Sequence, residues 1–124
     1  MKRKFIVLIL AAVWVVGASA PIRAHHGNAS LDTDKSVTLN GVVTEYLWSN
    51  PHVFLKIDVK DTSGEVRHWV IEAQNPIAQS NAGWSRSTFK AGDDVSVDII
   101  PAKGTAPIGR FRGRIVINGV VFKP

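Results

Sequence analysis

The sequence predicts an all-β fold, a small OB-like five-stranded β-barrel with a short helical connection between the third and fourth strands. Beyond a polar lead, the chain is rich in β-branched and aromatic residues that alternate with polar ones, as in half-buried strands. These runs come in the order of three strands, a short helical segment and two strands, which is the order of an OB barrel. Roughly 100 residues follow the leader, enough for one modest core. An open β-sandwich is the alternative fold.

The strands are expected at residues 35–48, 52–60, 65–73, 92–100 and 110–122. Gly41 lies inside the first of them and predicts a bulge or a sharp bend there. The last segment closes as one strand or as a hairpin with Asn118 and Gly119 at its tip. The proline and small polar residues of segment 75–90 predict two short helical turns. Segment 101–107 is a loop by its Gly, Pro and Ala content.

The second and third strands are expected to form a hairpin around the turn residues 61–64. A loop of those four residues pairs Lys60 with Glu65 and places Ile57 opposite His68. A slip of one residue would move every side chain to the other face of the sheet. The register is therefore a prediction that depends on the loop length.

The amino terminus reads as a secretory signal peptide, with a basic start, an unbroken apolar run over residues 5–16 and small residues after it. The apolar run is shorter than a membrane-spanning helix requires. Cleavage is expected after Ala24, and Ala20 is the alternative site. The expected organisation is a signal peptide at 1–24, a flexible mature N-terminus at 25–34 and the barrel at 35–124. It predicts a periplasmic protein with no stable membrane span after cleavage.

Charge and sulfur content restrict the function further. Removing four of the 15 basic residues and none of the 10 acidic ones leaves a mature net charge of +1. A balanced surface and export both argue against nucleic acid as a partner. The chain has no cysteine, and its one methionine is Met1. Any metal site must therefore use nitrogen and oxygen ligands.

Four segments together resemble a known family: "AHHGN", "VTLNGVVTEYLWSNPHVFLKIDVKD", "WVIEAQNP" and "GWSRSTFKAGDDVSVDIIPAKG". They are similar to a family of small exported bacterial domains of unknown function, over about Ala24 to Phe122. The resemblance implies an envelope location, a signal peptide and a β-barrel-like fold, and it supplies no reaction. Gly27 stands where that family often carries a serine after the paired histidines.

The paired histidines His25 and His26 are the first candidate site. Cleavage after Ala24 would make His25 the amino terminus, whose amine and imidazole together favour Cu(II). His26 is awkwardly placed to complete the site, so His52 or His68 would be the better partner. Cleavage before Ala24 would instead make His26 the third residue, and the amine, amides and imidazole could wrap Cu(II) or Ni(II). The competing interpretation is a solvated polar tail.

The "WSNPH" segment is the second candidate site. Pro51 forces Asn50 into an extended or turn conformation, so Trp48 and His52 flank a corner between two strands. Trp48 and Asn50 would contact a ligand or a partner at the barrel mouth. The alternative is a structural corner in which Trp48 fills the core.

The basic cluster "RFRGR" contributes Arg110 and Arg112 as candidate contacts to an anionic ligand. A solvated strand face with the arginines opposite aspartates is the competing interpretation.

No nucleophile elbow, phosphate-binding glycine loop or paired-carboxylate motif is present, so the sequence predicts a binding module and no enzyme. The expected function is an exported periplasmic binding module that binds Cu(II) through the mature N-terminal histidine. The alternative is a metal-free ligand- or protein-interaction module around Trp48 and His52. The expected partner is an envelope protein or a small ligand.

Overall fold

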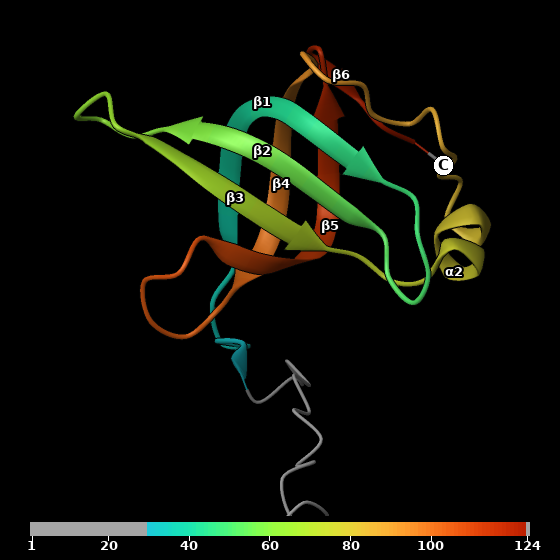
Figure 1. The fold of residues 1–124 in the computed structure, drawn as a ribbon, viewed down its shortest axis with the longest axis horizontal. Coiled ribbons are helices and arrows are strands. Elements are labelled where there is room, and N and C mark those ends of the chain that lie inside the picture. Colours follow the sequence, from blue (N-terminus) through green and yellow to red (C-terminus); the bar gives the residue numbers. More distant parts are fainter. Residues whose placement is uncertain (1–29, 124) are drawn as a thin grey trace, which may run out of the picture.

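The computed structural model of the protein describes residues 30–123. Within that range it contains six strands and one short helix (Figure 1). They are β1 (Val37–Leu47), β2 (Phe54–Lys60), β3 (Val66–Glu72), α2 (Pro76–Asn81), β4 (Asp94–Pro101), β5 (Ile108–Ile117) and β6 (Val120–Val121). The signal peptide, His25 and His26 are predictions that lie outside the described residues.

Five of these strands close into a barrel. β1 pairs with both β2 and β4, β2 pairs with β3, and β4 pairs with β5, all antiparallel. A short parallel pairing of β3 with β5 joins the two ends of the sheet. The helix α2 follows β3 and precedes β4. The structure thus confirms the predicted OB-like barrel with its helical connection, and Asn118 and Gly119 form the tip of the β5–β6 hairpin.

The core is formed by the inward-facing residues of the strands. In β2, the predicted alternation is confirmed, because Leu55 and Ile57 are buried and their neighbours Phe54, Lys56 and Asp58 are half-buried. Trp84 is buried in the core, where its ring packs edge-on against Phe89 and Phe111. One short helix forms where two helical turns were predicted. It begins at Pro76, and the Asn75 side chain accepts a hydrogen bond from the Ala78 amide.

The predicted register of the β2–β3 hairpin is wrong by one residue. Lys60 pairs with Val66 in place of Glu65, and Ile57 pairs with Trp69 in place of His68. The cause is the Asp61 side chain, whose Oδ1 accepts hydrogen bonds from the amides of Ser63 and Glu65. The Asp61 amide also donates to the Glu65 carbonyl, so Glu65 is part of the loop and does not begin the strand. Asp58 and His68 are consequently opposite each other.

The chain enters the barrel through residues that were predicted as part of the flexible lead 25–34. Leu31 is buried and forms a β-bridge with Ala102. The Asp32 amide donates to the Pro101 carbonyl, and the Lys103 amide donates to the Ser30 carbonyl. Residues 30–32 are therefore attached to the end of β4. Within residues 30–123, no helix is both long and apolar enough to cross a membrane.

Candidate functional site

The corner between β1 and β2 positions His52. The Asn50–Pro51 peptide bond is cis, and the Ser49 hydroxyl donates a hydrogen bond of 2.9 Å to the His52 carbonyl. Asn50 is exposed, whereas Trp48 is half-buried and packs against the core. The corner thus presents His52 while Trp48 supports it from the barrel side.

Tyr46 connects this corner to the core. Its ring meets that of Trp48 edge-on, at 6.2 Å between centroids, and its hydroxyl donates to the Ser85 carbonyl at 3.0 Å. Burial raises the pKa of Tyr46 to about 12. The hydroxyl therefore stays protonated near neutral pH and keeps its role as a hydrogen-bond donor.

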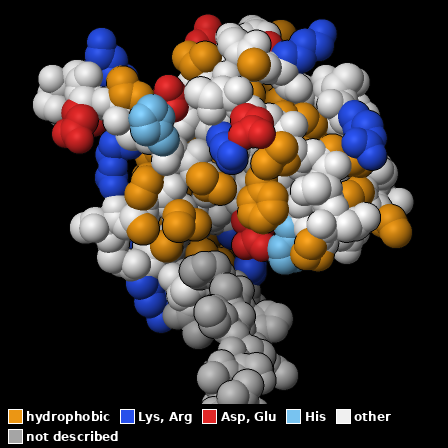
Figure 2. Space-filling view, viewed as in Figure 1, with side chains coloured by type: hydrophobic (Ala, Val, Ile, Leu, Met, Phe, Trp, Pro, Cys, Tyr) orange, Lys and Arg blue, Asp and Glu red, His pale blue; other side chains and the backbone are white. Residues whose placement is uncertain are grey.

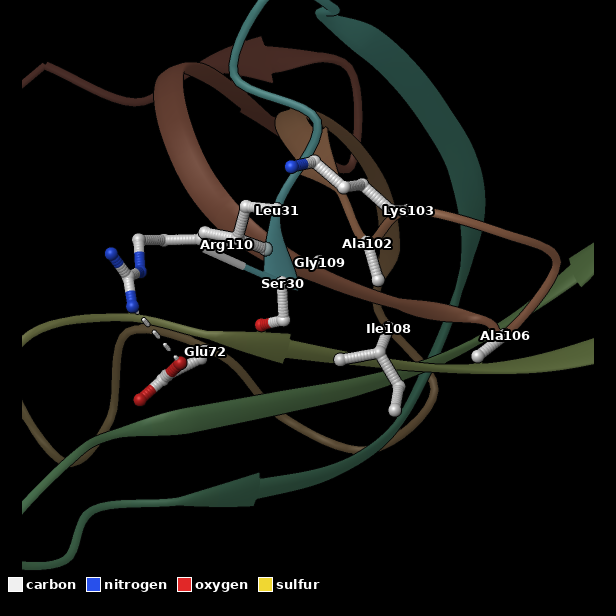
Figure 3. Close-up of a pocket in the computed structure, with 9 residues that line it drawn as sticks. All are labelled: Ser30, Leu31, Glu72, Ala102, Lys103, Ala106, Ile108, Gly109 and Arg110. Carbon is white, nitrogen blue, oxygen red and sulfur yellow. Dashed lines mark ion pairs between the residues drawn. The ribbon is translucent and has the colours of Figure 1, made fainter. Parts of the chain in front are cut away.

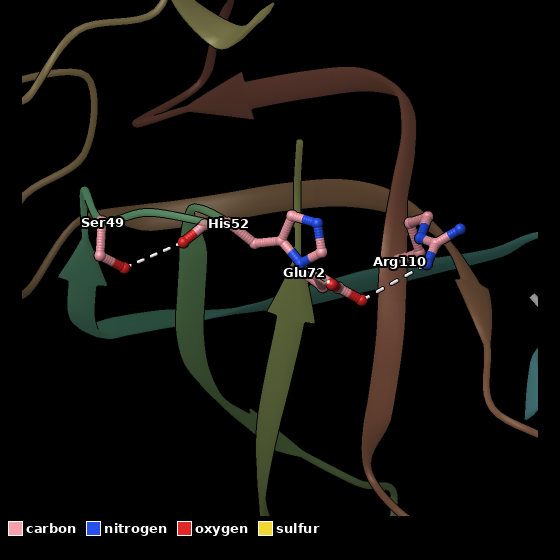
Figure 4. Close-up of polar contacts among 4 residues, drawn as sticks. All are labelled: Ser49, His52, Glu72 and Arg110. Carbon is pink, nitrogen blue, oxygen red and sulfur yellow. Dashed lines mark hydrogen bonds and ion pairs between the residues drawn. The ribbon is translucent and has the colours of Figure 1, made fainter. Parts of the chain in front are cut away.

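Glu72 contacts both His52 and Arg110 at one end of the barrel (Figure 4). Glu72 is the last residue of β3, and Arg110 is its partner on β5 in the parallel pairing that closes the barrel. One Glu72 oxygen, Oε1, meets Nδ1 of His52, and the other, Oε2, lies 3.5 Å from Nη2 of Arg110. The Glu72 side chain is 20% exposed, and that of His52 is 44% exposed.

Two hollows meet at the Glu72–Arg110 pair. The first has a volume of about 210 Å³ and is lined by Ser30 and Leu31 together with residues around the start of β5 (Figure 3). The second, of about 340 Å³, is lined by His52, Glu72, Ala73, Gln74, Asn75 and Arg110. Glu72 and Arg110 line both. The site therefore joins the β1–β2 corner to the point where the described chain begins.

The surface beside the site mixes apolar side chains with ion pairs. Figure 2 shows hydrophobic side chains gathered over β2 and β3, with charged side chains among them. The sheet register places Phe54 beside Glu72 and Val70 beside Ile108. Lys56 of this surface pairs with Glu45 on β1 at 2.5 Å. The Lys56 cation on this surface is thus balanced by a carboxylate.

His68 belongs to a different place on the sheet. Its Nδ1 lies 2.6 Å from Oδ1 of Asp58, and its side chain is 80% exposed. His68 precedes Glu72 by four residues on β3, which corresponds to about 13 Å along a strand. Within residues 30–123, no group of three or more His, Asp or Glu side chains could hold a metal ion. His52 and His68 therefore do not form one site with each other.

The basic cluster of β5 is divided by a bulge. Arg110 joins the His52 site, whereas Arg112 is exposed and lies next to Gly113, whose φ is +94°. The β4–β5 register shifts between Val97 and Ile99, opposite this segment. In the described part of the chain, Arg112 forms no ion pair, and it lines neither hollow. Of the two arginines, the structure brings Arg110 alone to the site.

Glu72 belongs to the candidate site, although the sequence did not indicate it as a site residue. Its position at the end of a strand, just before Asn75 and Pro76, resembles that of a surface or capping carboxylate. A correct β2–β3 register would have placed it opposite Phe54 and close to His52. Its contact with Arg110 depends on the parallel pairing that closes the barrel, for which the local sequence contains no signal.

Solved structures share this fold. One crystal form of the mitochondrial single-stranded DNA binding protein Rim1 from S. cerevisiae is 14% identical, with a TM-score of 0.51, covering 67% of this chain and 91% of that one. A second form is 12% identical, with a TM-score of 0.48, covering 67% and 92%. At these identities the likeness shows the fold alone. A search of curated proteins found no match.

The structural neighbours correct the sequence argument about partners, which allowed an envelope protein or a small ligand and excluded nucleic acid. Rim1, a protein named for binding single-stranded DNA, has the same type of fold as this chain. The net charge of +1 predicted for the mature chain was therefore insufficient ground for that exclusion. The physical reason is that net charge is a sum over the surface, whereas binding to a strand depends on local side chains.

The family comparison agrees with the segments singled out in the sequence. The profile of a family of unknown function, DUF6152, matches residues 12–110. The match includes the paired histidines, the β1–β2 corner with His52, and both Glu72 and Arg110. The chain belongs to this family of unknown function, DUF6152.

Proposed function

We propose that this protein is an exported, periplasmic binding module without catalytic activity, which binds Cu(II) through His25 at its mature amino terminus and through His52 at the barrel mouth. The leader composition supports export and removal of residues 1–24. The ligand set is three nitrogens, namely the terminal amine, the His25 imidazole and the His52 imidazole. Such a set suits Cu(II), which favours nitrogen ligands in a tetragonal arrangement.

One observation carries the choice of His52. Ser30, where the described chain begins, lines the same hollow as Glu72, and Glu72 contacts His52 (Figures 3 and 4). The five residues from His25 to Ala29 can span up to about 17 Å. His25 is therefore within covalent reach of this end of the barrel, and His68 lies farther along β3.

The test is Cu(II) binding by the mature protein, purified from the periplasm and followed by intact native mass and calorimetric titration. The His25→Ala and His52→Ala variants should each lose tight binding, because each removes at least one of the three nitrogens. His68→Ala is the matched control, since His68 is also paired with a carboxylate on the same sheet. It should bind Cu(II) as the wild type does.

The outcomes separate the parts of this proposal. A mature mass that begins at His25 supports export and the cleavage site, and retention of one copper supports the site. Unchanged affinity in His25→Ala would overturn the role of the terminus. Loss of binding in His68→Ala with retention in His52→Ala would overturn the choice of partner.

A metal-free ligand site in the same place is the second candidate. It is favoured by the polar lining of the 340 Å³ hollow, which includes His52, Gln74 and Arg110. A screen of small polar ligands by NMR should then shift the signals of these residues in protein freed of metal. Shifts confined to other surfaces would overturn it.

A further inference from the structure

The contact between His52 and Glu72 determines which ring nitrogen of the histidine is available. A carboxylate can only accept a hydrogen bond, so the hydrogen of this contact belongs to Nδ1 of His52. In a neutral imidazole the other nitrogen, Nε2, then has a free lone pair. Figure 4 shows the ring with one nitrogen against Glu72 and the other on the opposite side.

We propose that Glu72, held by Arg110, is a positioning residue that keeps His52 in the Nδ1–H tautomer and thereby presents Nε2 as the ligand nitrogen in the hollow. This inference deepens the Cu(II) site, and its metal-binding part rests on the proposed function. The part that concerns the tautomer rests on the described residues alone.

Arg110 contributes by interacting with one of the two carboxylate oxygens of Glu72. Its guanidinium takes Oε2 of Glu72, which leaves Oε1 for the imidazole. Glu72 and Arg110 come from strands that are hydrogen-bonded to each other, because the two residues are partners in the β3–β5 pairing. The carboxylate is thus held from both sides, and the orientation of the His52 ring follows from it.

Outer partners of this kind are usual at metal sites. A histidine that binds a metal commonly donates its second N–H to a carboxylate, which fixes the ring and makes it a better ligand. Replacing such a partner typically weakens metal binding by about 10–100-fold. The His52–Glu72 pair has this arrangement at the edge of a hollow.

The sheet also contains an internal control. His68 and Asp58 form the same kind of contact through Nδ1, but His68 is 80% exposed and lines neither hollow. The two pairs thus have the same chemistry and differ in their surroundings. Changes to Asp58 should alter His68 and leave His52 unaffected.

The first experiment reads the tautomers in metal-free mature protein by ¹⁵N NMR, at about pH 9, where an ordinary imidazole is neutral. We expect the Nδ1–H form for His52 in the wild type. Glu72→Ala should release His52 to the Nε2–H form, and Glu72→Gln should do the same, because Arg110 keeps the single amide oxygen and the amide N–H then donates to Nδ1. Asp58→Ala should change His68 alone.

The second experiment titrates the same variants with Cu(II). Glu72→Ala and Glu72→Gln should each weaken binding by about 10–100-fold, and Asp58→Ala should match the wild type. Thermal unfolding of each variant, followed by circular dichroism, verifies that the barrel is folded.

An Nε2–H tautomer of His52 in the wild type, or no change in Glu72→Ala, would overturn the inference. So would full Cu(II) affinity in Glu72→Ala combined with loss in His52→Ala. A wild type that shows the expected tautomers but binds no Cu(II) would refute the proposed function while supporting the role of Glu72 in positioning His52.

Discussion

Single aspartates hold turns of this barrel through backbone amides. Asp93, just before β4, accepts a hydrogen bond of 2.8 Å from the Lys90 amide and one of 2.9 Å from the Asn118 side chain. These bonds, that from Asn118 above all, lower the pKa of Asp93 below its ordinary value. One carboxylate therefore connects the turn before β4 to the tip of the β5–β6 hairpin.

Asp93→Ala should lower stability at neutral pH, and the difference from the wild type should shrink in acid. Because the folded-state pKa is depressed, the contribution is present above the unfolded-state pKa, near 3.9, and is lost as pH falls through the folded value. Urea unfolding at pH 7 and at about pH 2 would measure this. Asp34→Ala, at an exposed turn, is the control. A difference that persists unchanged in acid would contradict the prediction.

At the scale of the elements, β1 depends on Gly41 for its close contact with β2. Gly41 pairs with Val95 on β4, and a Cβ added there would lie 2.4 Å from the Asp58 carbonyl oxygen. The β1–β2 register shifts between Val43 and Glu45, so the bulge predicted at Gly41 lies farther along the strand. Gly41 itself permits the close approach of two strands.

Gly41→Ala should destabilise the protein by about 1–3 kcal/mol, because backbone has to move to accommodate the methyl group. The free energy of unfolding from urea titration measures the change. Val42→Ala, an exposed position of the same strand, should change it by less than about 0.5 kcal/mol. Equal stability of Gly41→Ala and wild type would show that the β1–β2 contact can relax.

At the scale of the whole molecule, the barrel is closed by a short parallel seam. Residues 70–72 of β3 pair with residues 108–110 of β5, and this seam also brings Glu72 to Arg110. Ile71 is 1% exposed beneath it. Gly109, its partner, leaves no room for a side chain, since an added Cβ would lie 2.5 Å from Cδ1 of Ile99. The candidate site thus depends on the β3–β5 pairing that closes the barrel.

Ile71→Ala should cost about 2–5 kcal/mol, because it removes buried methyl groups and leaves a cavity at the seam. Ile77→Ala is the matched control, since Ile77 is 76% exposed on α2 and should change stability by no more than about 0.5 kcal/mol. Thermal and urea unfolding compare the two variants. Similar stabilities for both would show that the seam contributes little to the barrel.

The local parts of this fold could be predicted from the sequence. The period-two alternation predicted which side of β2 faces the core, and the Asn118-Gly119 pair predicted the turn of the last hairpin. The β2–β3 register could not be predicted, because it depended on whether the Asp61 side chain would take Glu65 into the loop. A single hydrogen-bonding choice in a turn decides which residues are opposite each other along a whole strand.

The sequence by itself determined the fold class, the order of the strands and His52 as a candidate ligand, because these follow from patterns among neighbouring residues. Only the tertiary structure decided that Glu72 meets both His52 and Arg110, and that Arg112 and His68 lie elsewhere. The reason is that barrel closure joins β3 to β5, which are distant along the chain. No local period or turn signal specifies which side chains such a closure brings together.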